Sequence, residues 1–345
     1  QYGAALEGFS KMSIRSATVF ATLFWISVSH AGQVNVLFKA GTSPIEQDRV
    51  LLTAGGSCVR KIPALNLSTA VLPDARSHKA LSADASVTVV EDDAEALASE
   101  TSSRAKGAGK PVATQPAQTL PTGVDRIDAE VPGNTGAGVI VAVLDTGIDL
   151  THPDLSGALL RNADGTIIMH NSLNTSSSAM DDNGHGSHVS GIIAAQDNTI
   201  GVVGVATGAL LMPVKVLDRR GSGTYSGIAD GIVWATDHGA QVINMSLGGS
   251  SNSATLENAV KYAFAAGVQV VCAAGNSGPA DNTVQFPGKY TESIAVSAWQ
   301  DTDGQLGGDS EHLASFSSRG PEVDLTAPGY YILSTYKSGG YQTFS

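Results

Sequence analysis

The feature that most constrains this chain is an apolar run that ends abruptly in a carboxylate, at residues 139–149 (VIVAVLDTGID). Its six consecutive β-branched or aliphatic residues predict a central strand of a parallel sheet, buried on both faces. Asp145 follows this strand directly, and open α/β sheets bind ligands at the carboxyl ends of their strands. An aspartate in this position can equally cap a helix or close a turn, so its role depends on what lies beside it.

A glycine-rich segment at residues 183–191 (NGHGSHVSG) supplies a partner for this carboxylate. Gly184 and Gly186 flank His185 at the expected start of a helix, where they allow another backbone to approach and leave the imidazole unobstructed. His185 is therefore a candidate general base. His188, one turn further on, is interpreted as a packed, hydrogen-bonded core residue. An Asp that precedes the His excludes the chain order Ser, acid, His and fits the order Asp, His, Ser.

Apolar runs alternate with helical stretches through the rest of this region. The alternation predicts βαβ units with right-handed crossovers, and hence an α/β fold with a doubly wound parallel sheet and helices on both faces. The expected strands are 139–144, 210–216, 242–245, 268–273 and 293–297, and the expected helices are 185–195, 224–237 and 254–266.

Length and charge limit the class of protein. At 345 residues the chain has room for about two domains, and its 39 glycines and 42% hydrophobic residues suit a compact α/β protein. Residues 114–345 contain 22 acidic and 9 basic side chains, whereas residues 1–113 contain 10 and 11. Nucleic acid is excluded as a partner, because it requires a basic surface.

The two cysteines, Cys58 and Cys272, fall in different expected domains. A stabilising disulfide within the mature fold is therefore not expected, and cysteine is not the expected nucleophile. Cys272 lies inside an apolar run, where a small buried hydrophobic residue is the ordinary interpretation.

The N-terminal third divides into three segments. Residues 12–31 have the basic, apolar and small-residue pattern of a signal peptide, so the protein is expected to be secreted. The apolar part is shorter than the about 20 residues of a membrane span, and no stable membrane anchor is expected. Residues 33–98 indicate a small α+β unit, with strands at 34–39, 60–64 and 87–90 and a helix at 74–82. Residues 99–114 indicate a linker and processing region, and 115–345 a second domain.

Five segments in the second domain carry a resemblance to a known family. They are 141–149 (VAVLDTGID), 183–191 (NGHGSHVSG), 244–249 (NMSLGG), 273–278 (AAGNSG) and 316–329 (FSSRGPEVDLTAPG). Their order and spacing resemble the sequential signatures of the subtilisin-like serine proteases, over a region from about residue 118 to residue 345. Ser187 and Ser190 depart from the usual Thr and Ala. The resemblance implies a subtilisin-like fold and serine endopeptidase activity.

The resemblance implies catalytic roles for three residues. Asp145 would orient His185 and stabilise its imidazolium, and His185 would take the nucleophile's proton and return it to the leaving amine. Asn276 would be the side-chain donor of the oxyanion hole, although an asparagine in a Gly-Asn-Ser-Gly loop is also a common turn residue.

The resemblance also implies that substrate lies extended between two backbone edges and adds a strand through main-chain hydrogen bonds. These edges are Gly221, Ser222 and Gly223 on one side, and Ser246, Leu247 and Gly248 on the other. The pocket for the residue before the cut would be lined by Ala273, Ala274 and Gly275. Gln285 stands at the bottom of that pocket, where the family commonly has glycine, and this puts a preference for large apolar residues in doubt.

A structural Ca²⁺ ion is the implied cofactor, and no organic cofactor is expected. The family's oxygen ligands, which suit this hard cation, correspond to the side chains of Gln118, Asp154 and Asn198 and the carbonyls of Gln196, Ile200 and Val202. An ordinary hydrogen-bonded loop is the alternative interpretation of the same residues.

Residues 33–98 resemble the family's inhibitory propeptide, a ferredoxin-like unit that assists folding and then occupies the cleft. Their position between a signal peptide and a peptidase domain favours the same interpretation. The expected partners are polypeptide substrates and the chain's own propeptide, and the protein is expected to be a monomer.

The serine nucleophile is expected beyond the end of the given sequence. In the family a segment like 339–345 (GGYQTFS) runs into Gly-Thr-Ser-Met-Ala, and Ser345 falls three residues short of that serine in an ungapped alignment from residues 327–329. The peptidase domain is therefore expected to be C-terminally incomplete here, and the given chain inactive. The alternative function is a catalytically inactive, subtilisin-fold peptide-binding protein.

Overall fold

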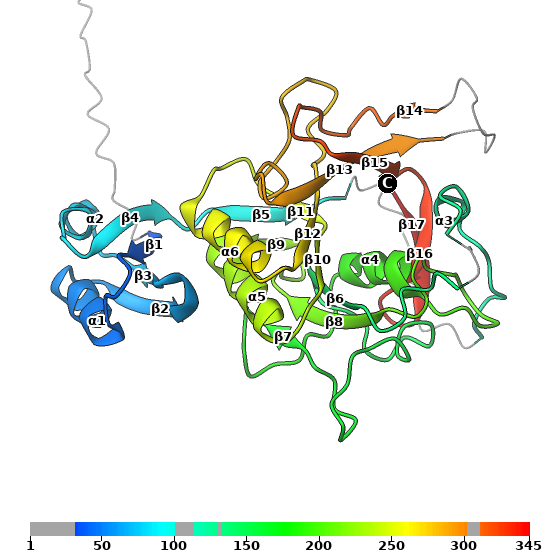
Figure 1. The fold of residues 1–345 in the computed structure, drawn as a ribbon, viewed down its shortest axis with the longest axis horizontal. Coiled ribbons are helices and arrows are strands. Elements are labelled where there is room, and N and C mark those ends of the chain that lie inside the picture. The colour runs from blue at the N-terminus through cyan, green and yellow to red at the C-terminus, as the bar shows by residue number, and fades with distance from the viewer. Residues whose placement is uncertain (1–31, 101–113, 130–132, 302–310) are drawn as a thin grey trace, which may run out of the picture.

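The computed structural model describes residues 32–100, 114–129, 133–301 and 311–345 (Figure 1). The predicted signal peptide and most of the predicted linker lie outside these residues. The described chain forms an N-terminal unit, residues 33–92, and a C-terminal unit, residues 114–345, and strand β5 (Glu95–Ala98) extends from the first into the second (Figure 1). No helix in the described ranges is long and apolar enough to cross a membrane.

The N-terminal unit is a four-stranded antiparallel sheet in the order β2-β3-β1-β4, covered by two helices. Its elements are β1 (Gln33–Phe38), α1 (Pro44–Thr53), β2 (Ser57–Ile62), a 3₁₀ turn η1 (Pro63–Leu65), β3 (Leu67–Val71), α2 (Ala75–Ser82) and β4 (Val87–Asp92). This is the expected ferredoxin-like α+β arrangement. Alternate residues of β1, such as Val34 and Val36, pack against Leu51 and Leu81 of the helices to form a small separate core.

A largely parallel sheet organises the C-terminal unit, in the order β14-β13-β12-β10-β6-β8-β7, with β15 also paired to β13. Its strands are β6 (Ile140–Asp145), β7 (His170–Asn171), β8 (Leu210–Lys215), β10 (Val242–Met245), β12 (Gln269–Ala273), β13 (Ser293–Gln300), β14 (His312–Leu313) and β15 (Leu325–Pro328). The other elements are α3 (Thr122–Asp125), α4 (His185–Ala194), β9 (Ser222–Thr224), α5 (Tyr225–Asp237), β11 (Leu247–Gly248), α6 (Ala254–Ala265), β16 (Ile332–Tyr336) and β17 (Gly340–Phe344).

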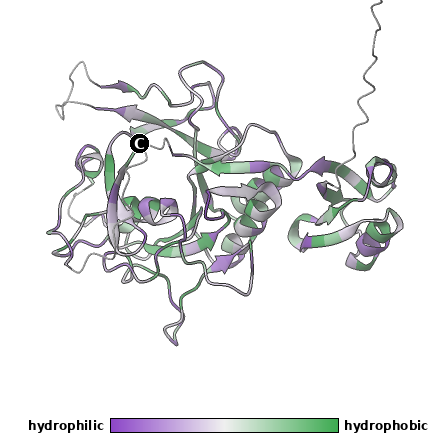
Figure 2. Cartoon of the chain, turned by 180° about the vertical axis from the view of Figure 1, so that it is seen from behind, coloured by the Kyte–Doolittle hydropathy of each residue, from purple (hydrophilic) through white to green (hydrophobic). Residues whose placement is uncertain are grey.

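Strand β6 lies inside this sheet, between β10 and β8, and its side chains enter a different core on each face. Ala142 and Leu144 pack in the core that contains α5 and α6, whereas Val141 and Val143 pack in the core that contains the end of α4. Figure 2 shows green, hydrophobic segments on strands inside the C-terminal unit, and others in the N-terminal unit. The prediction of a doubly wound α/β sheet with helices on both faces is confirmed.

Most expected elements agree with the structure to within one or two residues, but several do not. β13 continues three residues past the expected end at 297, because Trp299 and Gln300 pair with β14. Strand β3, which pairs with both β1 and β2, was not expected, and neither was the hairpin β16–β17. These strands are short or polar, and their pairing partners are what make them strands.

Candidate active site

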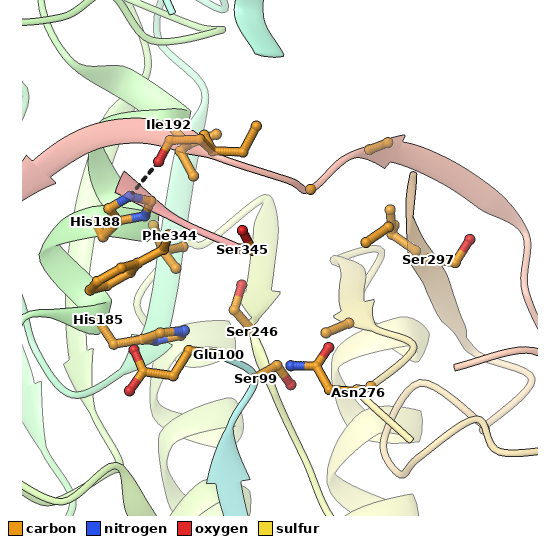
Figure 3. A pocket seen from close by; sticks show the side chains of 18 of the residues that line it. Ser99, Glu100, His185, His188, Ile192, Ser246, Asn276, Ser297, Phe344 and Ser345 are labelled. Carbon is orange, nitrogen blue, oxygen red and sulfur yellow. Dashed lines mark hydrogen bonds between the residues drawn. The ribbon is translucent and has the colours of Figure 1, made fainter. Parts of the chain in front are cut away.

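Asp145 and His185 meet at the carboxyl end of β6. The Nδ1 atom of His185 lies 2.8 Å from both carboxylate oxygens of Asp145, and both residues are buried. Because a carboxylate only accepts hydrogen bonds, Nδ1 must carry a proton and donate it to Asp145. The other ring nitrogen, Nε2, therefore remains for proton transfer, and His185 lines a cavity of about 280 Å³ (Figure 3).

Glycine is required where α4 approaches the end of β6. A Cβ atom on Gly186 would lie 2.1 Å from the carbonyl oxygen of Gly147, and Gly147 itself has a φ of 103°. Gly186 also donates its backbone N–H to Thr146 Oγ1 at 2.9 Å. The close backbone approach inferred from the sequence is thus present, and it holds His185 against Asp145.

Electrostatics favour the protonated form of His185 in this structure. Burial alone would lower the pKa of His185, but the charge and hydrogen bond of Asp145, helped by Glu100 and Asp181, raise this pKa to about 9. His188 has the opposite shift, because burial lowers its pKa to about 4. Its Nε2 atom lies 3.0 Å from the carbonyl oxygen of Ile332. His188 therefore has the structural role that the sequence indicated.

Asp181 is a functional residue that the sequence analysis did not single out. Its carboxylate accepts hydrogen bonds from the backbone N–H groups of Gly184 (2.8 Å) and Ser187 (2.9 Å) and from the hydroxyl of Thr146 (2.9 Å). A carboxylate at a helix N-terminus satisfies unpaired donors and interacts favourably with the helix dipole. Asp181 thus fixes the turn that presents the histidine, and its place four residues before that histidine was the available signal.

Asn276 follows β12 in a loop and lines the same cavity as His185. The preceding residue, Gly275, has a φ of 107°, which turns the chain sharply after the strand. No hydrogen bond to the Asn276 side chain occurs within the described part of the chain, and Figure 3 shows this amide directed toward Ser99. An unengaged amide at this position can donate to an oxygen that enters the site.

The two expected substrate edges flank strand β5 of the same chain. β5 pairs antiparallel with β9 on one side, with Leu97 opposite Ser222, and antiparallel with β11 on the other, with Ala98 opposite Leu247. The pairing continues past β5, because Ala98 N donates to the carbonyl of Gly221 at 2.8 Å and Ser99 N donates to the carbonyl of Ser246 at 2.9 Å. The cleft is thus occupied by an added strand, the mode of binding that main-chain edges allow.

Two carboxylates in and just after β4 bind the N-terminal ends of two helices in the C-terminal unit. Glu91 accepts hydrogen bonds from Ser253 Oγ (2.7 Å) and from the backbone N–H groups of Ala254 (3.0 Å) and Thr255 (2.9 Å) at the start of α6. Asp93 accepts from Ser226 N (2.8 Å) and Ser226 Oγ (2.7 Å) at the start of α5. Helix N-termini are natural sites for anions.

An ion pair adds to this contact between the two units. Arg60 of β2 lies 2.9 Å from the carboxylate of Asp230 in α5 and donates to the carbonyl of Ser172 at 2.6 Å. Burial raises the pKa of Asp230, but the hydrogen bond from His170 and the charge of Arg60 outweigh it and lower this pKa. The N-terminal unit is therefore attached by charged contacts as well as by β5.

The loop predicted to bind calcium, residues 196–202, packs around Asp154, which is buried. Its carboxylate accepts hydrogen bonds from Asn198 Nδ2 (2.8 Å), Val202 N (3.0 Å) and the hydroxyl of Tyr341 (3.3 Å), and burial raises its pKa. Gln196 N donates to the carbonyl of Asp154 at 3.1 Å.

Two further observations bear on the same loop. The side chain of Gln118 contacts Asp197 (3.0 Å) rather than Asp154, and Asn198 accepts from Ile200 N (2.7 Å). Among the described residues, no group of three or more His, Cys, Asp or Glu side chains could hold a metal. Any cation here would thus be held by one carboxylate and neutral oxygens.

The fold and the site define a class of α/β proteins. Its members hold an Asp–His pair and an unengaged side-chain amide beside a cleft that binds an extended strand. A sequence profile described as the Subtilase family matches residues 136–345. Subtilisin DY of Bacillus licheniformis is 45% identical over 234 residues, 66% of this chain and 79% of its own length. Subtilisin J of Geobacillus stearothermophilus is 37% identical over 342 residues, 98% of this chain and 80% of its own length.

Among solved structures, the chain is similar to fervidolysin from Fervidobacterium pennivorans, described as a keratinolytic enzyme related to subtilisin. The TM-score is 0.73 with 28% sequence identity over 92% of this chain, which spans about half (52%) of the length of that structure. The chain belongs to the subtilase family. The family and fold predicted from the five sequence motifs are therefore confirmed.

Proposed function

We propose that this protein is a secreted serine endopeptidase, made as a precursor whose residues 33–99 inhibit it. The observation that carries the proposal is the extended segment from Glu95 to Ser99, which pairs with both edges of the cleft and ends in the cavity that His185 lines. The relatives named subtilisin support the activity, and the pattern of residues 12–31 supports secretion.

The buried pair would carry out proton transfer. Because Asp145 accepts the Nδ1 proton of His185, the neutral ring has its free electron pair on Nε2 and can take the proton of a serine hydroxyl as that oxygen attacks the substrate carbonyl. Asp145 then stabilises the imidazolium, which returns the proton to the leaving amine. Asn276 donates its side-chain amide to the negative charge that develops on the carbonyl oxygen.

The attacking serine, in this proposal, comes from outside the described residues. Within those residues no serine hydroxyl is hydrogen-bonded to His185, and Ser345 Oγ accepts instead from Tyr331 N at 3.0 Å. The cavity beside His185 supports the proposal, because it leaves room next to the imidazole for a further side chain. Its apolar lining includes Ile192, Cys272, Val296, Phe316 and Ile332.

The proposed calcium site has donor chemistry that fits the ion. Asp154 is buried, and within the described residues no Lys or Arg lies within ion-pair distance of it, so its charge lacks a protein counter-ion. Asp154, the side-chain oxygens of Gln118 and Asn198, and the carbonyls of Gln196, Ile200 and Val202 would hold Ca²⁺. The bound ion would stabilise the folded loop and take no part in the reaction.

A fluorophosphonate probe and an unstructured protein substrate test the proposed activity on the natural full-length protein. Labelling of one serine together with hydrolysis is the expected result. His185→Ala should lower turnover by about 10⁶, the size of effect seen when subtilisin loses a triad member. His238→Ala, an exposed histidine at the end of α5, is the matched control and should retain activity. A folded, peptide-binding protein without labelling or hydrolysis would favour the inactive peptide-binding alternative.

A further inference from the structure

An arginine of the N-terminal unit binds the C-terminal unit outside the cleft. Nη1 of Arg60 lies 2.9 Å from Oδ2 of Asp230 in α5, and Nη2 donates to the carbonyl of Ser172 at 2.6 Å. The guanidinium thus bridges a carboxylate and a carbonyl, a two-point recognition that its planar fork suits. The side chains of Arg60 and Asp230 are 20% and 22% exposed, so solvent screens this pair less than an ion pair on the open surface.

The chain around this contact directs both partners toward each other. A register shift between Cys58 and Arg60, where β2 pairs with β3, marks a β-bulge, a feature that redirects a side chain. On the other side, Asp230 lies one helical turn after Ser226, which binds Asp93. The N-terminal unit therefore contacts two successive turns of α5, with a carboxylate at the first and a guanidinium at the second.

Asp230 has a second partner, a histidine of the C-terminal unit. Nε2 of His170 lies 2.8 Å from Oδ2 of Asp230, the same oxygen that Arg60 contacts. Because a carboxylate only accepts hydrogen bonds, this Nε2 carries a proton. The imidazole stacks on Trp234, with ring centroids 4.9 Å apart. Within the described residues, the other ring nitrogen has no hydrogen-bond partner, so it can accept a further proton.

A second proton on His170 would change which cation neutralises Asp230. The neutral ring leaves the charge of the carboxylate to Arg60. An imidazolium instead places its own positive charge 2.8 Å from the same oxygen and repels the guanidinium. Histidine is the side chain that ordinarily changes charge between about pH 5 and 8, whereas arginine stays protonated. The contact should therefore weaken as the pH falls.

The surroundings of His170 include few other groups that could produce the same pH dependence. The charged groups that face it are Asp230 from α5, Arg60 from β2 and, on the neighbouring strand β8, Lys215, which pairs with Asp182 at 2.7 Å. His238, directly after α5, also stacks on Trp234. At the active site, the pKa of His185 is about 9 and that of His188 about 4, so neither changes charge between about pH 5.5 and 7.5.

We propose that Asp230, His170 and the carbonyl of Ser172 form an arginine-binding site outside the cleft, and that protonation of His170 weakens its hold on Arg60. The partner that fits this site is the N-terminal segment of the chain itself, residues 33–99. The inference rests on the proposed role of this segment as an inhibitor, and it adds a control on its release: the segment attaches more weakly as the pH falls.

Hydrogen–deuterium exchange on the natural full-length protein tests this without requiring activity. The amides of Ala98 and Ser99 donate to the edges of the cleft, so they are protected only while the segment is attached. Their protection factors, which exclude the intrinsic effect of pH on exchange, should fall about 10-fold between about pH 7.5 and 5.5. His170→Gln should abolish this fall, because a glutamine amide donates to Asp230 at either pH. His238→Gln, at an exposed histidine, is the matched control and should retain it.

A second variant removes the arginine instead. Arg60→Gln should lower the protection at about pH 7.5 by about 10-fold, the size expected for one charged hydrogen bond. It should also remove the further fall at lower pH, because His170 then has no guanidinium to repel. Arg49→Gln, at an exposed arginine that pairs with Glu46 within the N-terminal unit, is the control and should change neither value.

Two outcomes would overturn the inference: protection that does not depend on pH in the unsubstituted protein, or a pH dependence that His170→Gln leaves unchanged. Hydrolysis of an unstructured protein substrate by the same preparations separates the two proposals. A protein that hydrolyses substrate but fails the exchange test would retain the endopeptidase function and lose this arginine site. A protein that passes the exchange test but hydrolyses nothing would retain the arginine site and lose the endopeptidase function.

Discussion

The N-terminal and C-terminal units differ in how much of their structure each provides for itself. The N-terminal core comprises eight buried residues, and the unit leaves Ile45 82% and Leu52 72% exposed. The C-terminal sheet is covered on both faces by helices, and its fully buried side chains include Leu144 of β6 and Ile228 of α5. A unit of about 60 residues buries a smaller share of its surface and is correspondingly marginal.

The difference explains where the charged groups of the N-terminal unit lie. Glu91, Asp93 and Arg60 all contact the C-terminal unit, and β5 completes its pairing only between β9 and β11. The helix ends and strand edges of the larger unit are already fixed, so little conformational entropy is lost when the smaller unit attaches to them. The larger unit should thus hold the Asp145–His185 pair in place without the smaller unit, whereas the smaller unit's role depends on attachment.

After the loss of His185, the largest effect should come from another change confined to the chemistry. Asn276→Leu should lower kcat by about 10²–10³, the cost of losing this donor in subtilisin, with little change in KM, since the amide acts only where charge develops. Binding of the N-terminal segment should be unaffected. Steady-state kinetics of the mature enzyme test this, with the exposed Asn252→Leu as control. A large rise in KM at unchanged kcat would contradict the assigned role.

A bound Ca²⁺ ion should stabilise the larger unit, because Asp154 belongs only to that unit. At a Ca²⁺ concentration 100 times Kd, binding would contribute about 2.7 kcal/mol, or a rise in Tm of about 5–10 °C for a domain of this size. Differential scanning calorimetry with EDTA and with millimolar Ca²⁺ measures it. Asp154→Asn should abolish the shift, and the exposed Asp281→Asn should not. Equal Tm values for the unsubstituted protein under both conditions would refute the site.

The two carboxylates that bind helix ends allow attachment and folding of the smaller unit to be separated. Within the described residues, the Glu91 carboxylate accepts hydrogen bonds only from the C-terminal unit, whereas Asp93 also accepts from Gln33 (2.6 Å) and Asn35 (2.9 Å) within its own unit. Glu91→Gln should weaken inhibition by the added 33–99 segment about 10-fold, because a charged hydrogen bond contributes about 1.5 kcal/mol. It should leave the melting of that segment unchanged.

Asp93→Asn, in contrast, should weaken inhibition and also lower the melting temperature of the segment. Asp92→Asn, at the exposed position between them, is the matched control for both measurements. Inhibition constants against the mature enzyme and circular dichroism of the isolated segment provide the two readouts. If Glu91→Gln lowered the melting temperature as much as Asp93→Asn, the division of roles between them would be wrong.

Much of the C-terminal unit could be predicted from sequence, because its central strands are continuous apolar runs. Two residues of this run, Val141 and Val143, face one core, and the other two, Ala142 and Leu144, face the second core. The apolar run thus indicated burial on both faces. The glycines around His185 likewise indicated that another backbone approaches closely.

Features that depend on distant partners were missed. Asp181 gains its role from the turn it closes, and nothing in its local sequence states that its oxygens meet Thr146. The boundary of the main-chain pairing was not predicted: Ser99, within the expected linker, donates to the carbonyl of Ser246. That boundary could not be set from composition, because a polar stretch does not reveal a strand that forms on another unit's edges.

The smallest expected effect concerns the charge that the N-terminal segment brings to His185. The raised pKa of His185, about 9 against an ordinary 6.5, means that the folded state binds this proton more tightly than the unfolded state. This contribution to stability is therefore fully present below pH 6.5 and is lost as the pH rises through about 9.

Glu100 is one cause of the shift, so Glu100→Gln should lower this pKa and make stability less dependent on pH between 6.5 and 9. NMR titration of labelled histidine in the precursor checks it, with the exposed Glu95→Gln at the start of β5 as control. An unchanged His185 titration in Glu100→Gln would show that the segment acts on the site only by occupying it.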